Sequence, residues 1–251
     1  MSVVGSITGK ESRQLLLSRR GVVWLLTFSG LLSAFSLLLV SNTELSLLDN
    51  AEVVYMMAGM VLAAGAVVAA VLGSDAYAGE KERGTLVPLL CAPIAPDALL
   101  AGKALGLLAG WGVMFAVSLP YLWAVGASGQ NLGAAMLYLA LFGTPVVLGI
   151  GCLSMALSAR TGSVVTSLLG AVTVLLLAAA PLLLGPGLRR TVIGRILDGV
   201  NPFAWALNTL DSVIIDSDPF SAQIPRLLLV TAWLVLCLLA ARRSTAKSRL
   251  L

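Results

Sequence analysis

The charged residues of this chain fall in clusters that leave long, apolar, uncharged runs between them. A helix of about 20 residues crosses the hydrocarbon core of a bilayer, and several runs reach that length. The longest run, 104–159, is long enough for two crossings and contains a polar break at 127–131. The pattern predicts an all-α polytopic membrane protein, a single transmembrane domain over 1–251, with six transmembrane helices at about 21–43, 53–74, 104–126, 132–157, 161–186 and 219–241.

The sixth span is the shortest of these runs. Only 15 uncharged residues lie between Arg226 and Arg242. At the helical rise they reach about 22 Å, which is less than the roughly 30 Å core. We therefore expect this span to begin near Pro219 or Ile224, with the Arg226 side chain extending toward the membrane interface.

The distribution of basic residues predicts the orientation. Cytoplasmic segments of membrane proteins are enriched in Lys and Arg. With six spans and both termini cytoplasmic, 12 of the 16 basic residues lie inside: Lys10, Arg13, Arg19, Arg20, Lys81, Arg83, Lys103, Arg160, Arg242, Arg243, Lys247 and Arg249. The first outer loop, 41–52, carries three acidic residues and no basic one. Both termini are therefore predicted to be cytoplasmic.

Two segments outside the spans have mixed polarity. In residues 2–20, Ile7 and Leu15 alternate with Lys10 and Glu11. This pattern fits an N-terminal amphipathic helix on the inner membrane surface, and it also fits an ordinary basic flank.

The second segment, 185–226, is semi-apolar and punctuated by Gly, Pro and Asp. It predicts short re-entrant helices that dip into the outer leaflet between spans five and six. The candidate residues of this element are Asn201, Pro202 and Phe203, because Pro202 after Asn201 suits the first turn of a helix.

Composition agrees with a membrane protein. Hydrophobic residues make up 59% of the 251 positions and charged residues only 11%, whereas soluble domains carry about 25% charged residues. The net charge of +4 suits basic flanks against anionic lipid, and nothing indicates a nucleic-acid partner.

Candidate chemistry is sparse. The chain has no histidine, and its three cysteines are far apart, so neither a metal site nor a disulfide framework is indicated. Residues 5–11 superficially resemble a phosphate-binding loop, but only three residues separate the glycines and Glu11 stands where Ser or Thr would hold magnesium. The predicted spans carry no paired carboxylate and no buried lysine, which argues against a proton-coupled transporter and an intramembrane hydrolase. We expect a non-catalytic chain without a cofactor of its own.

Three glycines recur at four-residue spacing where the third span begins: Gly102, Gly106 and Gly110. Such a small-residue face lets helix backbones approach closely, so we interpret it as a packing surface.

The segment 75–103 carries the densest charge cluster. Asp75, Glu80, Lys81, Glu82 and Arg83 are expected to continue the second span as a charged cytoplasmic helix. Gly84 and Thr85 break that helix, and an apolar stretch begins at Leu86. A docking surface needs an apolar patch, whose area is buried by the partner protein, and neighbouring charges, which fix the orientation of that partner. The alternative is a solvated loop whose charges only keep it inside.

The stretch SDAYAGEKERGTLVPLLCAPIAPDALLAGK (74–103) resembles the signature of ABC-2 type transporter permeases: an acidic residue that ends the second span, E-x-E-x-G-T-L, then PI and a closing lysine. The stretch NPFAWALNTLDSVIIDSDPF (201–220) also resembles the subgroup typified by the copper-maturation permease NosY and the gliding-motility permeases. The span pattern resembles this family over nearly the whole chain. The haem-exporter subunit CcmB has a similar central motif, but this chain is longer.

The resemblance implies a subunit of an ABC exporter in the bacterial cytoplasmic (inner) membrane. It would pair with a second permease copy, identical or not, and with separate ABC ATPase subunits that bind ATP and magnesium. An extracytoplasmic accessory protein is a further candidate partner. The residues from Glu80 to Leu86, with Asp75, would form a coupling helix seated on the ATPase, the 2–20 segment would lie beside it, and 196–215 would close the exit path.

The centres of the predicted spans carry no ionisable residue, which favours an apolar or amphipathic substrate over a small ion. Other classes of protein remain as alternatives: a solitary secondary transporter or channel, a membrane-bound enzyme, and a structural or force-transmitting membrane subunit of a cofactor-assembly complex.

Overall fold

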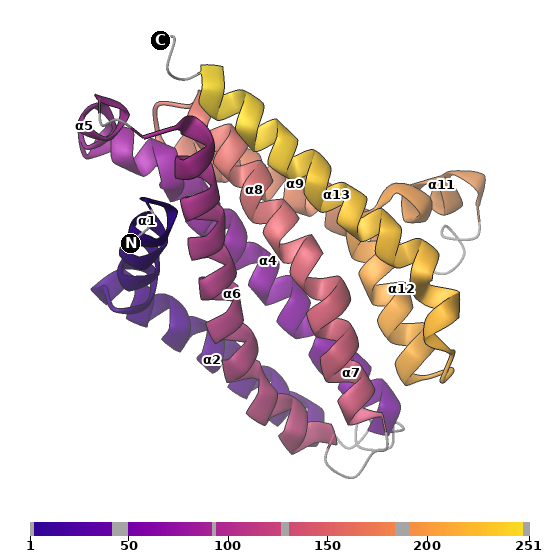
Figure 1. Ribbon diagram of the computed structural model, residues 1–251. Coiled ribbons are helices and arrows are strands. Elements are labelled where there is room, and N and C mark those ends of the chain that lie inside the picture. Colours follow the sequence, from indigo (N-terminus) through magenta and orange to yellow (C-terminus); the bar gives the residue numbers. More distant parts are fainter. Residues whose placement is uncertain (1–2, 42–49, 92–93, 127–130, 184–190, 248–251) are drawn as a thin grey trace.

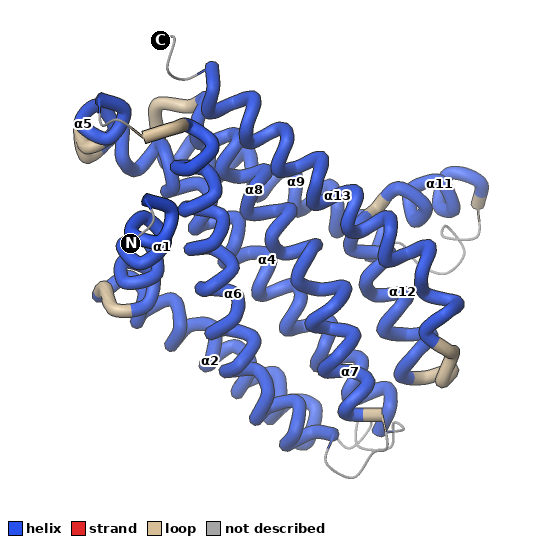
Figure 2. The backbone as a smooth tube through the Cα atoms, viewed as in Figure 1, coloured by secondary structure: helices blue, strands red, loops and turns tan. Residues whose placement is uncertain are grey.

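The computed structural model describes residues 3–41, 50–91, 94–126, 131–183 and 191–247. Within these ranges the chain is almost entirely helical and contains no strand (Figures 1 and 2). The helices are α1 (Val3–Leu16), α2 (Arg19–Ser41), α4 (Asn50–Glu82), α5 (Leu86–Cys91), α6 (Pro96–Gly126), α7 (Leu132–Tyr138), the π-helix η1 (Leu139–Gly143), α8 (Thr144–Arg160), α9 (Val164–Leu183), α11 (Val192–Val200), α12 (Pro202–Ile214) and α13 (Phe220–Lys247). The polar break predicted at 127–131 lies, apart from Asn131, outside the described residues.

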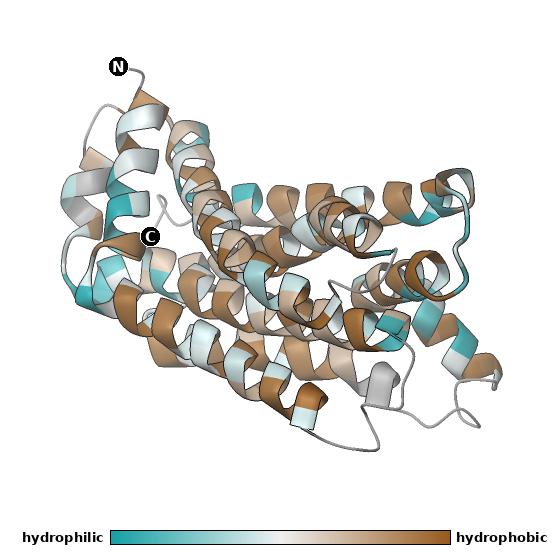
Figure 3. Ribbon diagram, turned by 90° about the horizontal axis from the view of Figure 1, so that it is seen from below, coloured by the Kyte–Doolittle hydropathy of each residue, from teal (hydrophilic) through white to brown (hydrophobic). Residues whose placement is uncertain are grey.

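In the described ranges, five helical segments are long and apolar enough to cross a membrane: Gly21–Ser41, Asn50–Glu82, Pro96–Gly126, Leu132–Arg160 and Phe220–Ala246. The fifth predicted span, 161–186, coincides with α9, whose described apolar part, Val164–Ala179, is shorter. Hydrophobic residues dominate the helices, and hydrophilic residues gather mostly near their ends (Figure 3). These features indicate a multi-pass membrane protein.

Two helices are much longer than a bilayer core. α4 has 33 residues and α6 has 31, which correspond to about 50 and 46 Å against a core of roughly 30 Å. The end of α4, the start of α6, α5 and the end of α13 gather at one end of the bundle, the upper end in Figure 1. α4 therefore continues past the predicted span end at residue 74 as an unbroken charged helix.

α4 also forms the centre of the bundle. It packs along α8 and contacts α6 and α9. Gly73 of α4 lies against the backbone of Gly151 in α8, and Gly65 lies under the ring of Trp111 in α6. The Trp111 indole nitrogen donates to the Thr144 hydroxyl at 2.9 Å. Small residues at these positions allow the close helix packing that stabilises membrane bundles.

The rod formed by α7, η1 and α8 contains one wide π-helical turn. Pro145 lies in the first turn of α8, directly after that turn. Proline has no N–H, and its ring clashes with the carbonyl oxygen four residues earlier, here that of Leu141 within η1. The π-helical turn lies where this clash would otherwise break the helix.

The connection between α9 and α13 folds into two helices, α11 and α12. Asn201 caps α12, because its side-chain oxygen accepts from the Phe203 N–H at 3.0 Å, and its amide nitrogen donates to the Ala178 carbonyl of α9 at 2.5 Å. Pro202 lies in the first turn of α12. At the other end of α12, the Asn131 side chain donates to the Ile214 carbonyl at 2.6 Å. The predicted short helices are present, and their position in the outer leaflet stays a prediction.

Arg226 of α13 lies against α12. Its Nη1 is 3.0 Å from the Asn208 carbonyl oxygen, 3.1 Å from the Ser212 hydroxyl and 2.8 Å from the Gln223 side-chain oxygen. These hydrogen bonds join α12 to α13, and the extension of the side chain toward the membrane interface stays a prediction. Three acceptors on two helices satisfy the guanidinium, which is a hydrogen-bond donor only.

We expect Arg226→Met to loosen α12 without unfolding the bundle. The variant loses hydrogen bonds from a charged donor, which are worth about 1.5 kcal/mol or more. Backbone amides of 202–214 should then exchange about tenfold faster in detergent. Arg243→Met, which removes an exposed cation from the same helix, serves as the matched control. Unchanged exchange in 202–214 of the Arg226 variant would contradict this role.

Candidate functional site

The end of α4 is a well-formed helix terminus. Gly84 adopts a positive φ of 69°, a conformation that glycine reaches without a Cβ penalty. The Gly84 N–H donates to the Lys81 carbonyl at 3.0 Å, and the Thr85 N–H donates to the Glu80 carbonyl at 2.9 Å. This pair of bonds is the Schellman motif. The predicted break at Gly84 and Thr85 is therefore present, and α5 begins at Leu86.

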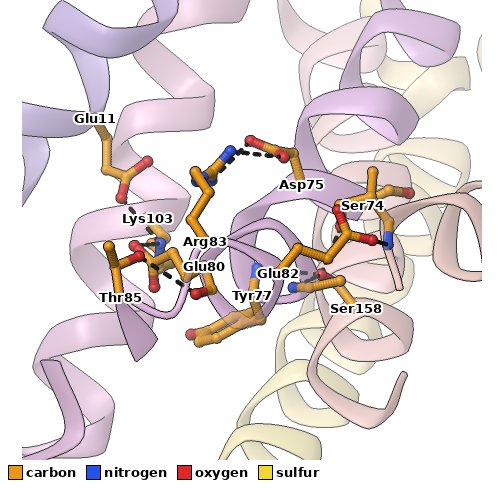
Figure 4. Close-up of polar contacts among 12 residues, drawn as sticks. Glu11, Ser74, Asp75, Tyr77, Glu80, Glu82, Arg83, Thr85, Lys103 and Ser158 are labelled. Carbon is orange, nitrogen blue, oxygen red and sulfur yellow. Dashed lines mark hydrogen bonds and ion pairs between the residues drawn. The ribbon is translucent and has the colours of Figure 1, made fainter. Parts of the chain in front are cut away.

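Glu80, in the last turn of α4, faces inward. Its Oε1 accepts from the Lys103 ammonium at 3.1 Å, and Lys103 also donates to Oε1 of Glu11 in α1 at 2.9 Å (Figure 4). The Lys103 side chain is only 3% exposed and that of Glu80 8%. We call Glu11, Glu80 and Lys103 the charge cluster. Glu80 and Lys103 lie near the two ends of the 75–103 segment, so their ion pair holds these two ends of the segment together.

The next two residues bind the turn between α8 and α9. The Lys81 ammonium donates to the carbonyls of Ala159 and Thr161, at 2.7 and 2.9 Å, and so caps the end of α8. A Glu82 carboxylate oxygen accepts from the N–H of Val164, the first residue of α9, at 2.8 Å. Cations at a helix C-terminus and anions at an N-terminus are each favourable, because they satisfy groups that have no partner within the helix.

Asp75 and Arg83 form a pair on the exposed side of α4. Their closest atoms are 3.2 Å apart, and both side chains are about one-third exposed, 35% and 37%. Pairs of this kind contribute little to stability, because water already solvates both charges. The exposed residues at this end are Glu82, Arg83, Gly84, Thr85, Pro88 and Cys91, while Leu86 is buried.

A serine of α8 enters the hydrogen-bond ladder of α4. The Ser158 hydroxyl donates to the Ser74 carbonyl at 2.6 Å and accepts from the Ala78 N–H at 2.7 Å (Figure 4). These two backbone groups would bond to each other in a regular α-helix. A side chain inserted into the ladder is a recognised cause of helix bending. Ser158 therefore joins α8 to α4 one turn before the charge cluster.

The glycines of α6 lie against α1. A Cβ atom on Gly102 would lie 2.5 Å from the Ile7 side chain, one on Gly106 would lie 2.7 Å from the Glu11 Cβ, and one on Gly110 would lie 3.7 Å from the Leu15 side chain. Partners in both helices advance by four residues at each step, so α1 runs parallel to the start of α6. The contact surface of these glycines is the N-terminal helix.

Sequence analysis missed three residues at this end of the bundle. The sequence placed Glu11 in an amphipathic segment and Lys103 at the cytoplasmic flank as the closing lysine of the motif, without predicting that they pair, and it did not single out Ser158. Lys103, directly before the predicted third span, is buried in α6 because two carboxylates from other helices surround its ammonium. The signal for Glu11 was its position between Ile7 and Leu15 at four-residue spacing, on the face that meets the glycines.

The model of the family described as ABC-2 family transporter protein matches residues 6–244. That match spans nearly all of the helical bundle, including most of α1 and the charge cluster. The chain belongs to the ABC-2 transporter family. As an ABC-2 permease it is the membrane subunit of an ABC transporter, a class that is generally non-catalytic and generally pairs with an ABC ATPase subunit. A comparison with curated proteins found no match.

Proposed function

We propose that this ABC-2 permease couples ATP hydrolysis by a separate ATPase subunit to export of an apolar or amphipathic substrate. The observation that carries the proposal is that successive charged residues at the end of α4 contact different helices of the bundle. Glu80 binds α6 and, through Lys103, α1, whereas Lys81 and Glu82 bind the turn between α8 and α9. A displacement of the 82–91 region would therefore act on both sides of the bundle.

The ATPase would contact the exposed part of this region. Gly84 and Thr85 are exposed at the turn, and Pro88 and Cys91 are exposed on α5. The charged residues behind them would transmit the movement inward. We assign ATPase coupling to Asp75, Glu80, Lys81, Glu82, Arg83, Gly84, Thr85 and Leu86. ATP and magnesium would bind to the partner subunit.

The proposed topology has six spans with both termini cytoplasmic. α9 contains 20 residues, and at 1.5 Å per residue it reaches about 30 Å, which matches a bilayer core. The end of α4, the start of α6 and the end of α13 share one end of the bundle (Figure 1). This arrangement agrees with the enrichment of basic residues on the side assigned to the cytoplasm.

An apolar or amphipathic substrate suits the composition of the spans. The charged residues of the five long apolar segments lie near their ends, and the central turns carry none. Ionisable side chains inside spans are the usual mark of ion pathways. Direct transport of a hydrophilic ion by the complex would overturn this part of the proposal.

Further partners follow from the same assignment. Exposed apolar side chains on α2, α9 and α13, among them Leu26, Leu169 and Leu236, offer surface for lipid and for a second permease copy. We place the complex in the bacterial cytoplasmic (inner) membrane and the chain in the NosY and gliding-permease subgroup. The re-entrant element at Asn201, Pro202 and Phe203 would close the outer exit, where an extracytoplasmic accessory protein is a candidate partner.

The test is gentle affinity purification of the chain from its own host, with identification of the proteins that accompany it. We expect a near-stoichiometric partner that carries a phosphate-binding loop and hydrolyses ATP. In the Glu82→Ala variant the Val164 N–H loses its acceptor, and we expect ATP hydrolysis of the complex to fall about tenfold with membrane insertion intact. Arg243→Ala, at the end of α13, is the matched control.

The outcomes separate the alternatives. A chain that purifies without an ATPase would point to a solitary transporter or channel, or to a structural membrane subunit. An ATPase that accompanies the chain but hydrolyses ATP normally in the Glu82→Ala variant would keep the transporter class and remove Glu82 from the coupling site.

A further inference from the structure

We propose that Lys103 is a positioning residue that fixes α1 to the end of α4, so that the N-terminal helix moves together with the coupling region. This inference rests on the proposed coupling function for its role in transport. Its structural content is testable on the isolated chain.

The charge cluster joins three helices at one atom. The Lys103 ammonium in α6 binds Glu11 of α1 at 2.9 Å and Glu80 of α4 at 3.1 Å, and it lies 5.2 Å from the centre of the Tyr77 ring. Lys10 of α1 approaches the same Glu80 oxygen at 3.8 Å. An isolated buried ammonium is strongly unfavourable, so its two carboxylates must stay close whenever the bundle is folded.

The cluster is poorly built as a stabilising element. The second carboxylate oxygen of Glu80 and the Tyr77 hydroxyl are buried and have no hydrogen-bond partner within the described part of the chain. A buried ion pair often contributes less to stability than apolar side chains of equal size would, and its best-attested role is to specify register. The arrangement therefore favours a role in positioning over a role in stability.

The position of α1 depends also on close packing against α6. Its inner face rests on the glycines of α6, where the side chains of Ile7 and Glu11 leave no room for a Cβ atom. One weak hydrogen bond, from the Thr8 hydroxyl to the Gly102 carbonyl at 3.4 Å, accompanies them. The two ion pairs of Lys103 connect α1, α6 and α4 through buried charges, and the longer pair of Lys10 with Glu80 joins α1 to α4 from the exposed side.

The same pairs connect α1 to the terminus of α4. The Glu80 carbonyl accepts from the Thr85 N–H in the turn that leads to α5, while the Glu80 carboxylate binds Lys103. A shift of that turn therefore moves Glu80, and the pair with Lys103 carries the shift to Glu11. The outer face of α1 presents Lys10 and Arg13, because Glu11 is turned inward. α1 is positioned as a second, basic part of the surface that meets the ATPase.

The test measures a distance between α1 and α5 with spin labels. Cys91 on α5 is exposed and the other two cysteines are buried, so Cys91 accepts one label and Gln14→Cys, at an exposed site on α1, accepts the other. We expect a single narrow distance distribution in the otherwise unaltered chain. Lys103→Met should broaden it severalfold, and Lys103→Arg, which keeps both ion pairs, should restore it. Arg13→Met, which removes an exposed cation from the same helix, should leave it narrow.

A second variant guards against misfolding caused by unpaired carboxylates. The combined change Glu11→Gln, Glu80→Gln and Lys103→Met removes the charges and leaves no buried ion without a partner. Release of α1 in this variant supports the inference, and a narrow distribution in both this variant and Lys103→Met overturns it. In the complex with its ATPase, we expect Lys103→Met to lose the shared movement of both labels on ATP binding, and Arg13→Met to keep it. Absence of any ATPase would defeat the proposed coupling function and leave the measurement on the isolated chain valid.

Discussion

Gly73→Leu is expected to prevent the central helix pair from packing and to give the largest loss of folded protein. Even a Cβ atom at this position would lie 2.4 Å from the Gly151 carbonyl oxygen and 2.7 Å from the Ser154 Cβ. The first of these atoms is backbone, so it cannot move aside by changing a rotamer. α4 and α8 would have to separate, at a cost of about 3 kcal/mol or more. The measurement is the fraction of purified protein that stays monodisperse after heating in detergent.

A matched control distinguishes this contact from a general effect of replacing glycine in a membrane helix. Gly112→Leu places the same side chain on α6, where a Cβ atom meets nothing within 4 Å. We expect this variant to behave like the unaltered protein. Equal losses in both variants would show that the α4 and α8 contact is not the sensitive one.

Gly84→Pro is expected to abolish ATP-dependent function while the protein still inserts into the membrane. Gly84 has a φ of 69°, whereas proline fixes φ near −65°. Proline also lacks the N–H that Gly84 donates to the Lys81 carbonyl. The end of α4 and the start of α5 would therefore be redirected, while the rest of α4 keeps its packing against α8. The measurement is ATP hydrolysis by the purified complex, compared at equal amounts of inserted protein.

Gly84→Ala supplies the graded comparison for this position. A left-handed conformation costs an alanine about 1–2 kcal/mol, and the N–H is retained. We expect intermediate activity from this variant. If Gly84→Pro hydrolysed ATP at the normal rate in a complex of normal composition, the turn would have no part in coupling.

The charged motif shows where prediction from the sequence ends. A helical end at Gly84 followed from the residue types, because glycine suits a left-handed terminus. The partners of Glu80, Lys81 and Glu82 did not follow. Successive helical residues point about 100° apart, so neighbours in the motif meet different helices. The sequence pattern indicated either a docking surface or a solvated loop for these charges, and it did not indicate that Glu80 binds Lys103 of α6 while Lys81 and Glu82 bind the turn between α8 and α9.

The amino-acid sequence by itself determined that the chain is helical and apolar enough for a membrane, where its long spans lie, and where α4 must end. These properties depend on local composition and backbone preference, which any window of the chain carries. Only the tertiary structure decided that the glycines of α6 hold α1, that Ser158 enters the ladder of α4, and that Lys103 is buried between Glu11 and Glu80. Those contacts join residues 23 to 95 positions apart, and they depend on how the helices pack rather than on any local pattern.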